Sequence, residues 1–335
     1  MRIKHKNIKN ICVIQLQPFG DVFLTTSYFK ALKEFYPGAR LTYLMKEPYQ
    51  KIVLNHPYID RIITIKKAKG LQYIAERIKT FHKIRNEKFD LVIDQQNMPS
   101  SQVLAFMSGA PYRLGYKSGR KNLDFLYNIQ AEFGPTRYSA NQKFDIVKPL
   151  GMAEKPCALI LPIPEVDEQA MGQWMSLQNL HPEQTLVISP GSRFPRKKWP
   201  ADAFANLADR MAQTFNFKTV IIWGPGEETD AELVKSLMTS SAIIAPPTTF
   251  QQAGAILKRS TLLVCNDNGV SHSTVAFGVK TITIFGPTDP RCWSPASAYN
   301  THRHLHNPAA EKHDPSFGIS PDMVFDEIKD FLCLP

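Results

Sequence analysis

Short runs of apolar residues alternate along the first half of the chain with longer stretches in which apolar residues recur every three or four positions. Runs of four or five apolar residues are typical of buried strands in a parallel sheet, and the wider spacing is typical of helices with one buried face. The pattern predicts strands at 11–14, 41–44, 61–65 and 91–94, and a helix over 71–85. This alternation indicates a parallel sheet flanked by helices.

The second half repeats the alternation after a proline-rich stretch between residues 150 and 166, which indicates a linker. Strands are predicted at 186–188, 219–223, 262–265 and 281–285, and helices at 200–215, 230–238, 250–258, 269–277 and 321–332. We therefore predict an α/β chain with two doubly wound parallel-sheet domains. The predicted divisions are domains at 1–155 and 166–320, a linker at 156–165 and a C-terminal helix within 321–335.

Length and composition narrow the class of protein further. The 335 residues suit about two domains, and a hydrophobic content of 43% excludes a disordered chain. No apolar run approaches the roughly 20 residues that a transmembrane helix needs. The apolar stretch after the basic N-terminus is too short for a secretion signal, so we expect a cytoplasmic protein. Five scattered cysteines indicate reduced thiols rather than a disulfide framework or a zinc site.

The net charge of +10 is divided unevenly between the halves. Residues 1–150 contain 25 lysines and arginines against 11 acidic residues, which gives +14 and leaves −4 for the remainder. Such asymmetry favours an anionic partner for the first half, whether nucleic acid, a membrane surface or a phosphorylated small molecule. Solvated lysine-rich helix faces explain the count equally well. Nucleic-acid binding is not predicted, because no helix-turn-helix, zinc-finger or RNA-recognition signature is present.

The loop after the first predicted strand leads through Gly20 and Asp21 into a helical pattern. Ligands of open α/β sheets bind beyond the carboxyl ends of the strands, so this loop is a candidate site. Asp21 either caps the helix or acts as a general base that takes a proton from an incoming hydroxyl. Position alone favours the cap, because aspartate is common there.

Two loops of the second half carry groups that suit a nucleotide. The loop 189–200 combines small residues with four cations, which can bind phosphate, although an exposed basic loop explains it as well. Its order is not that of a P-loop, so ATP hydrolysis is not predicted. After the next strand, Glu227 or Glu228 either accepts hydrogen bonds from a ribose or stabilises the start of a helix. The candidate phosphate ligands in the loop 189–200 are Gly191, Ser192 and Lys197.

The loop 266–272 lies between an apolar strand and a helix rich in small residues, at an edge that suits a pyrophosphate. Its candidate residues are Asp267, Asn268, Gly269 and His272. Metal chemistry has little support, because the sequence contains no D-x-D or H-E-x-x-H motif. Three histidines that alternate over 302–306 in a predicted loop give only a weak metal signal. We therefore predict neither a metal site nor a cofactor.

Taken together, these blocks resemble glycosyltransferase family 9, the bacterial ADP-heptose:lipopolysaccharide heptosyltransferases. The resemblance covers about residues 11–295, with the motifs in family order. The motifs are Ile14-Gln-Leu-Gln-Pro-Phe-Gly-Asp21, Ser189-Pro-Gly-Ser192 with Lys197-Lys-Trp-Pro200, Trp223-Gly-Pro-Gly-Glu227, and Asn266-Asp-Asn-Gly-Val-Ser-His272 with Phe285-Gly-Pro-Thr-Asp-Pro290. The resemblance implies a GT-B architecture, in which two Rossmann-like domains face each other and the active site lies in the cleft.

The resemblance also implies roles for the candidate residues. Asp21 is then the general base of an inverting, metal-independent enzyme that moves heptose from ADP-heptose to the lipopolysaccharide inner core. The implied donor ligands are Gly191, Ser192 and Lys197 for the diphosphate, Glu227 or Glu228 for the ribose, and Asp267, Asn268, Gly269 and His272 for the donor sugar and phosphate. The family usually has Thr or Ser where this chain has Asn268, which leaves the donor sugar open.

The implied partners are ADP-heptose and a lipid A–core oligosaccharide, with peripheral contact of the basic half with the anionic inner membrane. Acceptor-binding residues do not carry over from the family. Two alternatives stay open. One is an enzyme of the same fold that uses another nucleotide sugar, such as an epimerase or a transferase, and the other is a degenerate nucleotide-sugar-binding protein. The presence of Asp21, Lys197, Asp267 and His272 argues against the second.

Overall fold

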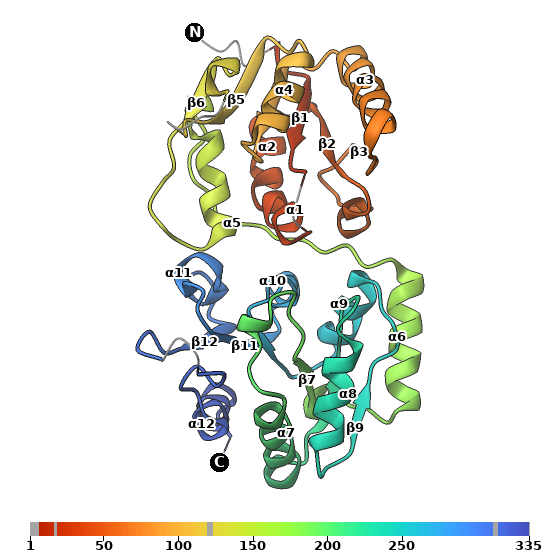
Figure 1. Cartoon of the computed structure of the whole chain (residues 1–335), viewed down its shortest axis with the longest axis vertical. Helices are drawn as coiled ribbons and strands as arrows, with labels where there is room; N and C mark the ends of the chain where they lie inside the picture. Colours follow the sequence, from red (N-terminus) through yellow and green to blue (C-terminus); the bar gives the residue numbers. More distant parts are fainter. Residues whose placement is uncertain (1–6, 17–18, 119–122, 311–313, 335) are drawn as a thin grey trace. The chain divides into compact units, whose positions relative to one another are not determined.

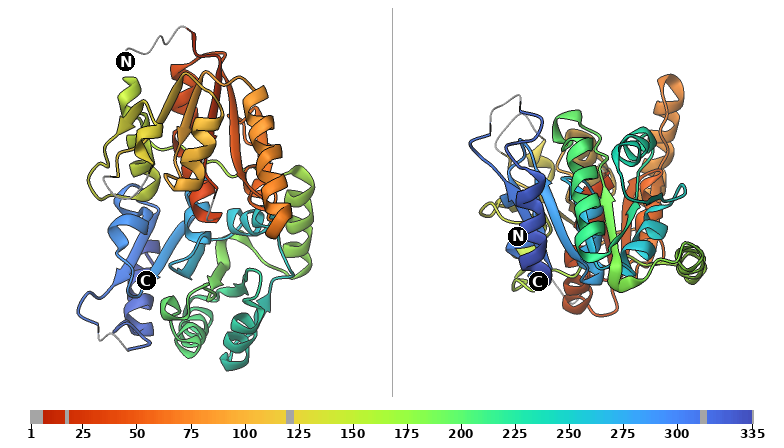
Figure 2. Two further views of the ribbon diagram at one scale, coloured as in Figure 1. Left: turned by 45° about the horizontal axis from the view of Figure 1, so that its top comes forward. Right: turned by 90° about the horizontal axis from the view of Figure 1, so that it is seen from below.

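The chain divides into two compact units, Met1–Pro162 (unit 1) and Ile163–Pro335 (unit 2). The computed structural model describes residues 7–16, 19–118, 123–310 and 314–334. Each unit contains a six-stranded sheet, and helices pack on both faces of each sheet (Figures 1 and 2). The predicted α/β class with two parallel sheets is confirmed.

The sheet of unit 1 has the order β3-β2-β1-β4-β5-β6, and all neighbouring strands are parallel. Its strands are β1 (Asn10–Ile14), β2 (Arg40–Lys46), β3 (Arg61–Ile65), β4 (Leu91–Asp94), β5 (Tyr112–Tyr116) and β6 (Ile129–Ala131). Its helices are α1 (Phe19–Thr25), α2 (Phe29–Phe35), α3 (Gly70–Asn86), α4 (Pro99–Met107) and α5 (Ser139–Gln142). Short 3₁₀ helices are η2 (Thr26–Tyr28), η3 (Tyr49–Val53), η4 (Asp124–Leu126) and η5 (Lys143–Leu150).

Unit 2 has the order β12-β11-β10-β7-β8-β9, again parallel throughout. Its strands are β7 (Thr185–Ser189), β8 (Lys218–Ile221), β9 (Ala242–Ile244), β10 (Leu262–Asn266), β11 (Lys280–Phe285) and β12 (His302–His306). Its α-helices are α6 (Glu165–Leu177), α7 (Ala201–Phe215), α8 (Glu228–Leu237), α9 (Phe250–Lys258), α10 (Val270–Ser273), α11 (Pro290–Trp293) and α12 (Pro321–Leu332). Its 3₁₀ helices are η6 (Pro182–Gln184), η7 (Pro195–Lys197), η8 (Thr274–Phe277) and η9 (Pro295–Ser297).

Both sheets have the strand order of a Rossmann fold. The first strand of each unit lies at the centre, the next two strands are added on one side of it, and the last three on the other. Buried aliphatic residues of the central strands pack against the apolar faces of the flanking helices. In α7, for example, Phe204, Leu207 and Met211 recur at helical spacing and are fully buried. The helix ends at Asn216, which adopts a left-handed conformation with φ 58°.

Four strands were not predicted from the sequence, namely β5, β6, β9 and β12. Three of them, β6, β9 and β12, are edge strands with one neighbour each, so they need fewer apolar residues than central strands. The prediction of a loop around the three histidines was wrong, because His302, His304 and His306 belong to β12. His302 Nε2 lies 2.9 Å from Thr274 Oγ1, and His304 Nδ1 lies 2.9 Å from Ser294 Oγ. These rings contact hydroxyl groups of neighbouring turns.

The helices of the described ranges include none that is long and apolar enough to cross a membrane. Within each unit, parallel pairing brings the carboxyl ends of all strands to one edge of the sheet. The loop that contains Asp21 follows β1, and the loops of the predicted donor site follow β7, β8 and β10. The fold thus collects the predicted residues of each unit at one edge, as the sequence analysis expected.

Candidate active site

Asp21 is the third residue of α1 and lies in its first turn, inside the helix rather than at the N-cap position. Its Oδ1 atom lies 2.8 Å from Nζ of Lys143, and the two side chains are 21% and 10% exposed. Lys143 is far away in the sequence, at the start of η5. The candidate base is therefore a partly accessible carboxylate in an ion pair with a nearly buried lysine.

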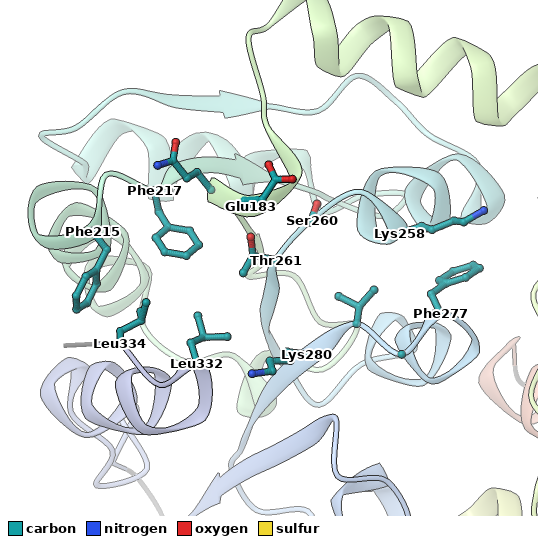
Figure 3. Close-up of a pocket in the computed structure, with 13 residues that line it drawn as sticks. Glu183, Phe215, Phe217, Lys258, Ser260, Thr261, Phe277, Lys280, Leu332 and Leu334 are labelled. Atoms are coloured by element: carbon teal, nitrogen blue, oxygen red, sulfur yellow. The ribbon is translucent and has the colours of Figure 1, made fainter.

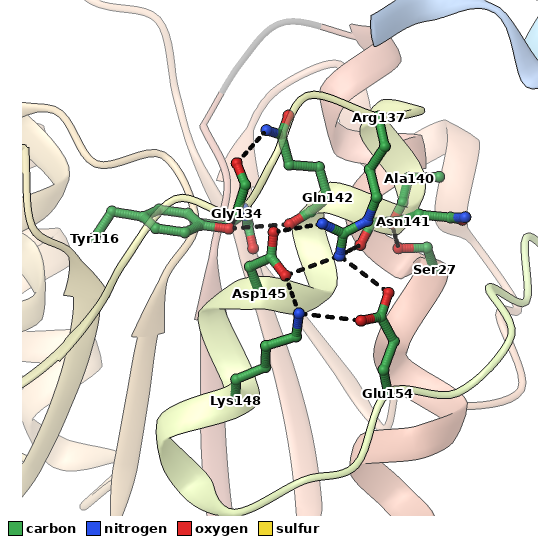
Figure 4. Close-up of polar contacts among 11 residues, drawn as sticks. Ser27, Tyr116, Gly134, Arg137, Ala140, Asn141, Gln142, Asp145, Lys148 and Glu154 are labelled. Atoms are coloured by element: carbon green, nitrogen blue, oxygen red, sulfur yellow. Dashed lines mark hydrogen bonds and ion pairs between the residues drawn. The ribbon is translucent and has the colours of Figure 1, made fainter. Parts of the chain in front are cut away.

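An ionic network holds η5, the helix that carries Lys143 (Figure 4). Asp145, two residues after Lys143, is 2% exposed and pairs with Arg137 at 2.8 Å and Lys148 at 2.6 Å. Both cations also contact Glu154 at 3.0 Å. Burial raises the pKa of Asp145, but the hydrogen bonds and charges of its two cationic partners outweigh burial and lower that pKa overall. These contacts fix the helix turn that places Lys143 beside Asp21.

A second buried acid, Asp94, ends β4 at the same edge of unit 1 and was not singled out from the sequence. Its Oδ2 accepts a 2.7 Å hydrogen bond from the Tyr127 hydroxyl, and its Oδ1 accepts from the backbone N–H groups of Gln96 and Asn97. Burial raises its pKa to about 6, although these hydrogen bonds act in the opposite direction. Asp94 is fully buried, so it organises the turn after β4 and is not available to a substrate.

In unit 2, three consecutive residues at the end of β10, whose last residue is Asn266, bind the loop that follows β7. Asn266 is fully buried; its Nδ2 donates to the Pro190 carbonyl at 2.6 Å and its Oδ1 accepts from the Trp199 N–H at 2.9 Å. Asp267 Oδ2 lies 2.5 Å from Nζ of Lys197 in η7. We call this set of contacts from residues 266–268 the clasp. Its first member, Asn266, holds both ends of the loop and thereby positions Lys197.

Asn268 completes the clasp. Its Nδ2 donates to Ser189 Oγ and to the Gly191 carbonyl, each at 3.1 Å, and its Oδ1 accepts from the Val270 N–H. A primary amide has two hydrogens, so these two contacts use its donor capacity. Asn268, which was predicted to bind the donor sugar and phosphate, therefore lies against the loop that precedes Lys197.

Gly191 is required by the close approach of Glu227. A Cβ atom at Gly191 would lie 2.3 Å from Glu227 Oε2, closer than two such atoms can be. Glu227 Oε2 also accepts a 3.0 Å hydrogen bond from the Gly224 N–H, and burial raises the pKa of this carboxyl. Glu228 is exposed on the first turn of α8. Of the two candidate acids, Glu227 is the one beside the Gly191 loop.

The remaining predicted residues lie in the same loops. Ser192 is 6% exposed, and its Oγ accepts from the Phe194 N–H at 3.4 Å. Gly269 precedes α10, and His272 within α10 is only 4% exposed. The loops of unit 2 thus bring together Gly191, Glu227 and the Lys197–Asp267 pair, whereas His272 is turned into the protein.

Sequence reasoning missed two residues that position this chemistry. Asn266 had a signal, because a polar residue that directly follows an apolar strand and is itself buried must find partners. Lys143 had none, because its contact with Asp21 joins distant parts of the chain. In the described ranges, no group of three or more His, Cys, Asp or Glu residues is placed to hold a metal ion.

A cavity of unit 2 lies away from these loops (Figure 3). This cavity of about 670 Å³ lies beside the amino ends of β7, β10 and β11, and Phe215, Phe217 and Leu332 contribute apolar surface. None of the predicted donor ligands lines it. It is therefore separate from the loops at the carboxyl edge.

Comparison with known proteins decides the family. A model of glycosyltransferase family 9 (heptosyltransferase) matches residues 77–317. The chain belongs to glycosyltransferase family 9. Lipopolysaccharide heptosyltransferase 2 of Escherichia coli K12 is 24% identical, over 96% of this chain and 98% of that one. The predicted family is therefore confirmed, and the protein is a glycosyltransferase.

Solved structures of the family share the fold. A family 9 glycosyltransferase from Veillonella parvula superimposes with a TM-score of 0.86 at 24% identity, covering 98% of both chains. The E. coli heptosyltransferase WaaC with ADP gives a TM-score of 0.76 at 19% identity, covering 96% of this chain and 99% of that one. The predicted GT-B class is confirmed by these neighbours together with the two parallel sheets.

Proposed function

We propose that this family 9 glycosyltransferase transfers heptose from ADP-heptose to the inner core of lipopolysaccharide, with inversion at the anomeric carbon and without a metal ion. The observation that carries the proposal is the clasp with its Lys197–Asp267 pair. The clasp lies at the carboxyl edge of the unit 2 sheet, and its residues belong to the motifs that mark the family. The names of the relatives support the same donor and acceptor class.

Unit 2 supplies the proposed donor site. Lys197 is the cation that meets the charge of the donor diphosphate, and the Gly191–Ser192 backbone approaches the phosphates closely because Gly191 has no side chain. Glu227 accepts hydrogen bonds from the ribose hydroxyls. Asp267 orients the Lys197 ammonium before the donor arrives, since the two side chains are in contact. Transition-state charge on the leaving ADP is then stabilised by a fixed lysine rather than by a bound metal.

Asp21 is the proposed general base. As the acceptor oxygen attacks the anomeric carbon, its proton passes to the Asp21 carboxylate while the bond from that carbon to the ADP oxygen breaks. One displacement from the face opposite ADP inverts the configuration. Lys143 holds the carboxylate in a single orientation through the 2.8 Å ion pair. It acts on Asp21 and is therefore a positioning residue.

Asn268 takes a positioning role in this proposal instead of binding phosphate directly. Its amide donates to Ser189 and Gly191, so it fixes the backbone that approaches the diphosphate. Gly269 precedes α10, and His272 is buried within that helix. Asn268, where the family usually has Thr or Ser, is therefore compatible with ADP-heptose as the donor.

The proposed acceptor is a lipid A–core oligosaccharide at the inner face of the bacterial inner membrane. Its phosphates and acidic sugars match the +14 charge of residues 1–150. The protein would act in the cytoplasm, in peripheral contact with the anionic lipid surface.

The proposal is tested by incubating the enzyme with a lipid A–core acceptor and ADP-heptose, UDP-hexose or GDP-hexose in parallel. Mass spectrometry should detect a heptose added from ADP-heptose, and the chemical shift and coupling of the new anomeric proton report the inversion. Transfer from a UDP- or GDP-sugar alone would replace the donor in the proposal. Donor binding without transfer to any core acceptor would favour a nucleotide-sugar-binding protein instead.

A further inference from the structure

Helix α3 exposes two large aliphatic side chains on one side. Ile74 and Ile78 are 55% and 51% exposed, and residues four apart lie on the same side of a helix. Farther along the same apolar stripe of α3, Phe81 and Ile84 pack on the core of unit 1. The stripe therefore extends past the core toward the start of α3, where more than half of each isoleucine is exposed.

The surroundings of this pair are strongly basic. Residues 66–88 contain eight lysines and arginines and two glutamates. One of these acids, Glu87, is already paired with Arg61 at 2.5 Å. The exposed cations of this segment are Lys66, Lys67, Lys69, Lys79, Lys83, Arg85 and Lys88. Apolar side chains within a basic surface are the composition that binds anionic lipid interfaces.

The place of α3 in the fold adds to this argument. The helix follows β3, so it begins at the carboxyl edge of the sheet and runs back along it (Figure 1). Ile74 lies in its first half, Ile78 lies at its middle, and Lys66, Lys67 and Lys69 precede it. The basic and apolar groups therefore lie toward the edge of unit 1 that also carries Asp21.

Helix α8 of unit 2 offers a comparison with a similar apolar pair. Leu233 and Leu237 are 52% and 46% exposed, and they are also four residues apart. The helix, however, contains Glu228, Asp230 and Glu232 against one lysine. The acidic side chains of α8 would repel an anionic surface. Two exposed aliphatic side chains alone are therefore not enough for binding to an anionic lipid surface.

We propose that α3, together with Lys66, Lys67 and Lys69, docks on an anionic lipid bilayer. The cations bind the lipid headgroups, and Ile74 and Ile78 enter the boundary between headgroups and acyl chains. The proposal deepens the proposed function, because it names the surface that brings the enzyme to a lipid-borne acceptor. It assigns to Ile74 and Ile78 a role outside the catalytic site.

The proposal is tested by co-sedimentation of the full-length protein with phosphatidylcholine vesicles that contain or lack phosphatidylglycerol. Wild type should bind only the anionic vesicles and should dissociate at high salt, since a membrane surface potential is screened within about 8 Å at physiological ionic strength. The variant I74S/I78S should bind on the order of tenfold more weakly, because it loses two partly buried aliphatic chains at constant charge. Charge reversal at the three lysines (K66E/K67E/K69E) should reproduce the effect of high salt.

The matched control is L233S/L237S, which removes the same number of exposed aliphatic side chains from α8. Its vesicle binding should equal that of wild type. Equal losses in the two serine pairs, or wild-type protein that does not bind anionic vesicles, would overturn the proposal. Thermal melting of each variant establishes that it is folded.

Activity measurements separate this proposal from the proposed function. I74S/I78S should retain kcat and both KM values with a water-soluble, deacylated acceptor, and should lose activity on an acceptor embedded in vesicles. The binding assay contains neither donor nor acceptor, so its result stands even if heptose transfer fails. Equal loss on both acceptors would instead place α3 in the acceptor site and contradict a lipid-docking role.

Discussion

The two units have the same strand order, yet they hold their functional side chains in different ways. In unit 2, three consecutive residues at the end of β10 bind the segment from Ser189, the last residue of β7, to Trp199. In unit 1, Asp21 contacts Lys143, more than a hundred residues further along the chain. The proposed donor side is therefore built at the ends of neighbouring strands, and the proposed base is held by a contact between distant segments.

This difference determines how much of each side is encoded by local sequence motifs. Residues of the clasp lie at the end of β10 and contact the loop after the neighbouring strand β7, so two short motifs encode the loop and its support. The position of Asp21 depends instead on η5 and on the ionic network around Asp145. We therefore expect the two sides to respond differently to substitution, with effects on donor binding confined to unit 2.

The largest effect is expected at Asp21. The variant D21N should lower kcat about 10²–10⁴-fold, because the acceptor hydroxyl loses its proton acceptor. Donor affinity should stay close to the wild-type value, since the donor ligands are in unit 2. The measurement is kcat together with the Kd for ADP-heptose by calorimetry.

A control separates catalysis from stability, because D21N leaves Lys143 without its partner in a nearly buried position. The double variant D21N/K143M removes both charges and should regain the melting temperature but not the activity. Recovery of turnover in this stable double variant would show that Asp21 is structural and would defeat its assignment as the base.

The next largest effect is expected at Lys197. The variant K197A should weaken donor binding by about 10²-fold, as expected for loss of a hydrogen bond to a charged phosphate, and should leave acceptor KM unchanged. It also leaves the buried carboxylate of Asp267 unpaired, so K197A/D267N is the variant to compare for stability. Donor titrations of both variants and of wild type give the comparison.

Metal removal tests the same part of the mechanism. Wild-type activity should survive EDTA, because Lys197 meets the diphosphate charge. Complete loss of wild-type activity in EDTA, restored by magnesium or manganese, would contradict the metal-independent mechanism.

A smaller effect is expected within the clasp. The variant N268D keeps an oxygen for the Val270 N–H but replaces the donor to the Gly191 carbonyl by an acceptor. We expect donor KM to rise about tenfold, since one lost hydrogen bond and a repulsive contact displace the loop. The variant N268T, with the residue type usual in the family, should retain most of the affinity. A donor KM equal to that of wild type in N268D would remove Asn268 from the positioning of the Gly191 loop.

The parts that could be predicted from the sequence are those encoded by local patterns. Apolar runs predicted the central strands, and the helix over 321–332 has the predicted bounds because Ser320 caps it and apolar residues recur at helical spacing. The interior strand β5 and the edge strands β6, β9 and β12 were missed, and β12, for example, reads His-Arg-His-Leu-His and lacks an apolar run. The donor loops were found through their motifs. Lys143 was not, because a tertiary ion pair leaves no periodic or local signal.

The smallest effect on activity is expected at Asp94, the buried acid of unit 1 that accepts hydrogen bonds from Tyr127, Gln96 and Asn97. Burial raises its pKa from 3.8 to about 6, so the folded state favours the protonated acid. The stability that this group contributes is therefore complete below about pH 4 and is lost as pH rises through 6. A shift of this size corresponds to about 3 kcal/mol.

The variant D94N does not titrate, so its free energy of unfolding minus that of wild type should increase by about 2–3 kcal/mol between pH 4 and pH 8. Taking this difference cancels the titration of all other groups, and kcat should stay unchanged at pH 7.5.

Urea unfolding followed by circular dichroism reports both units, whereas the four tryptophans lie in unit 2 and their fluorescence follows that unit alone. The pH-dependent difference should thus be present in the dichroism and absent from a separate fluorescence transition. Y127F is the matched control: it removes the hydroxyl that donates to Asp94 but keeps the titrating carboxyl, so its pH slope should persist. If the difference in unfolding free energy between D94N and wild type is constant from pH 4 to pH 8, Asp94 does not contribute to the pH dependence of unit 1.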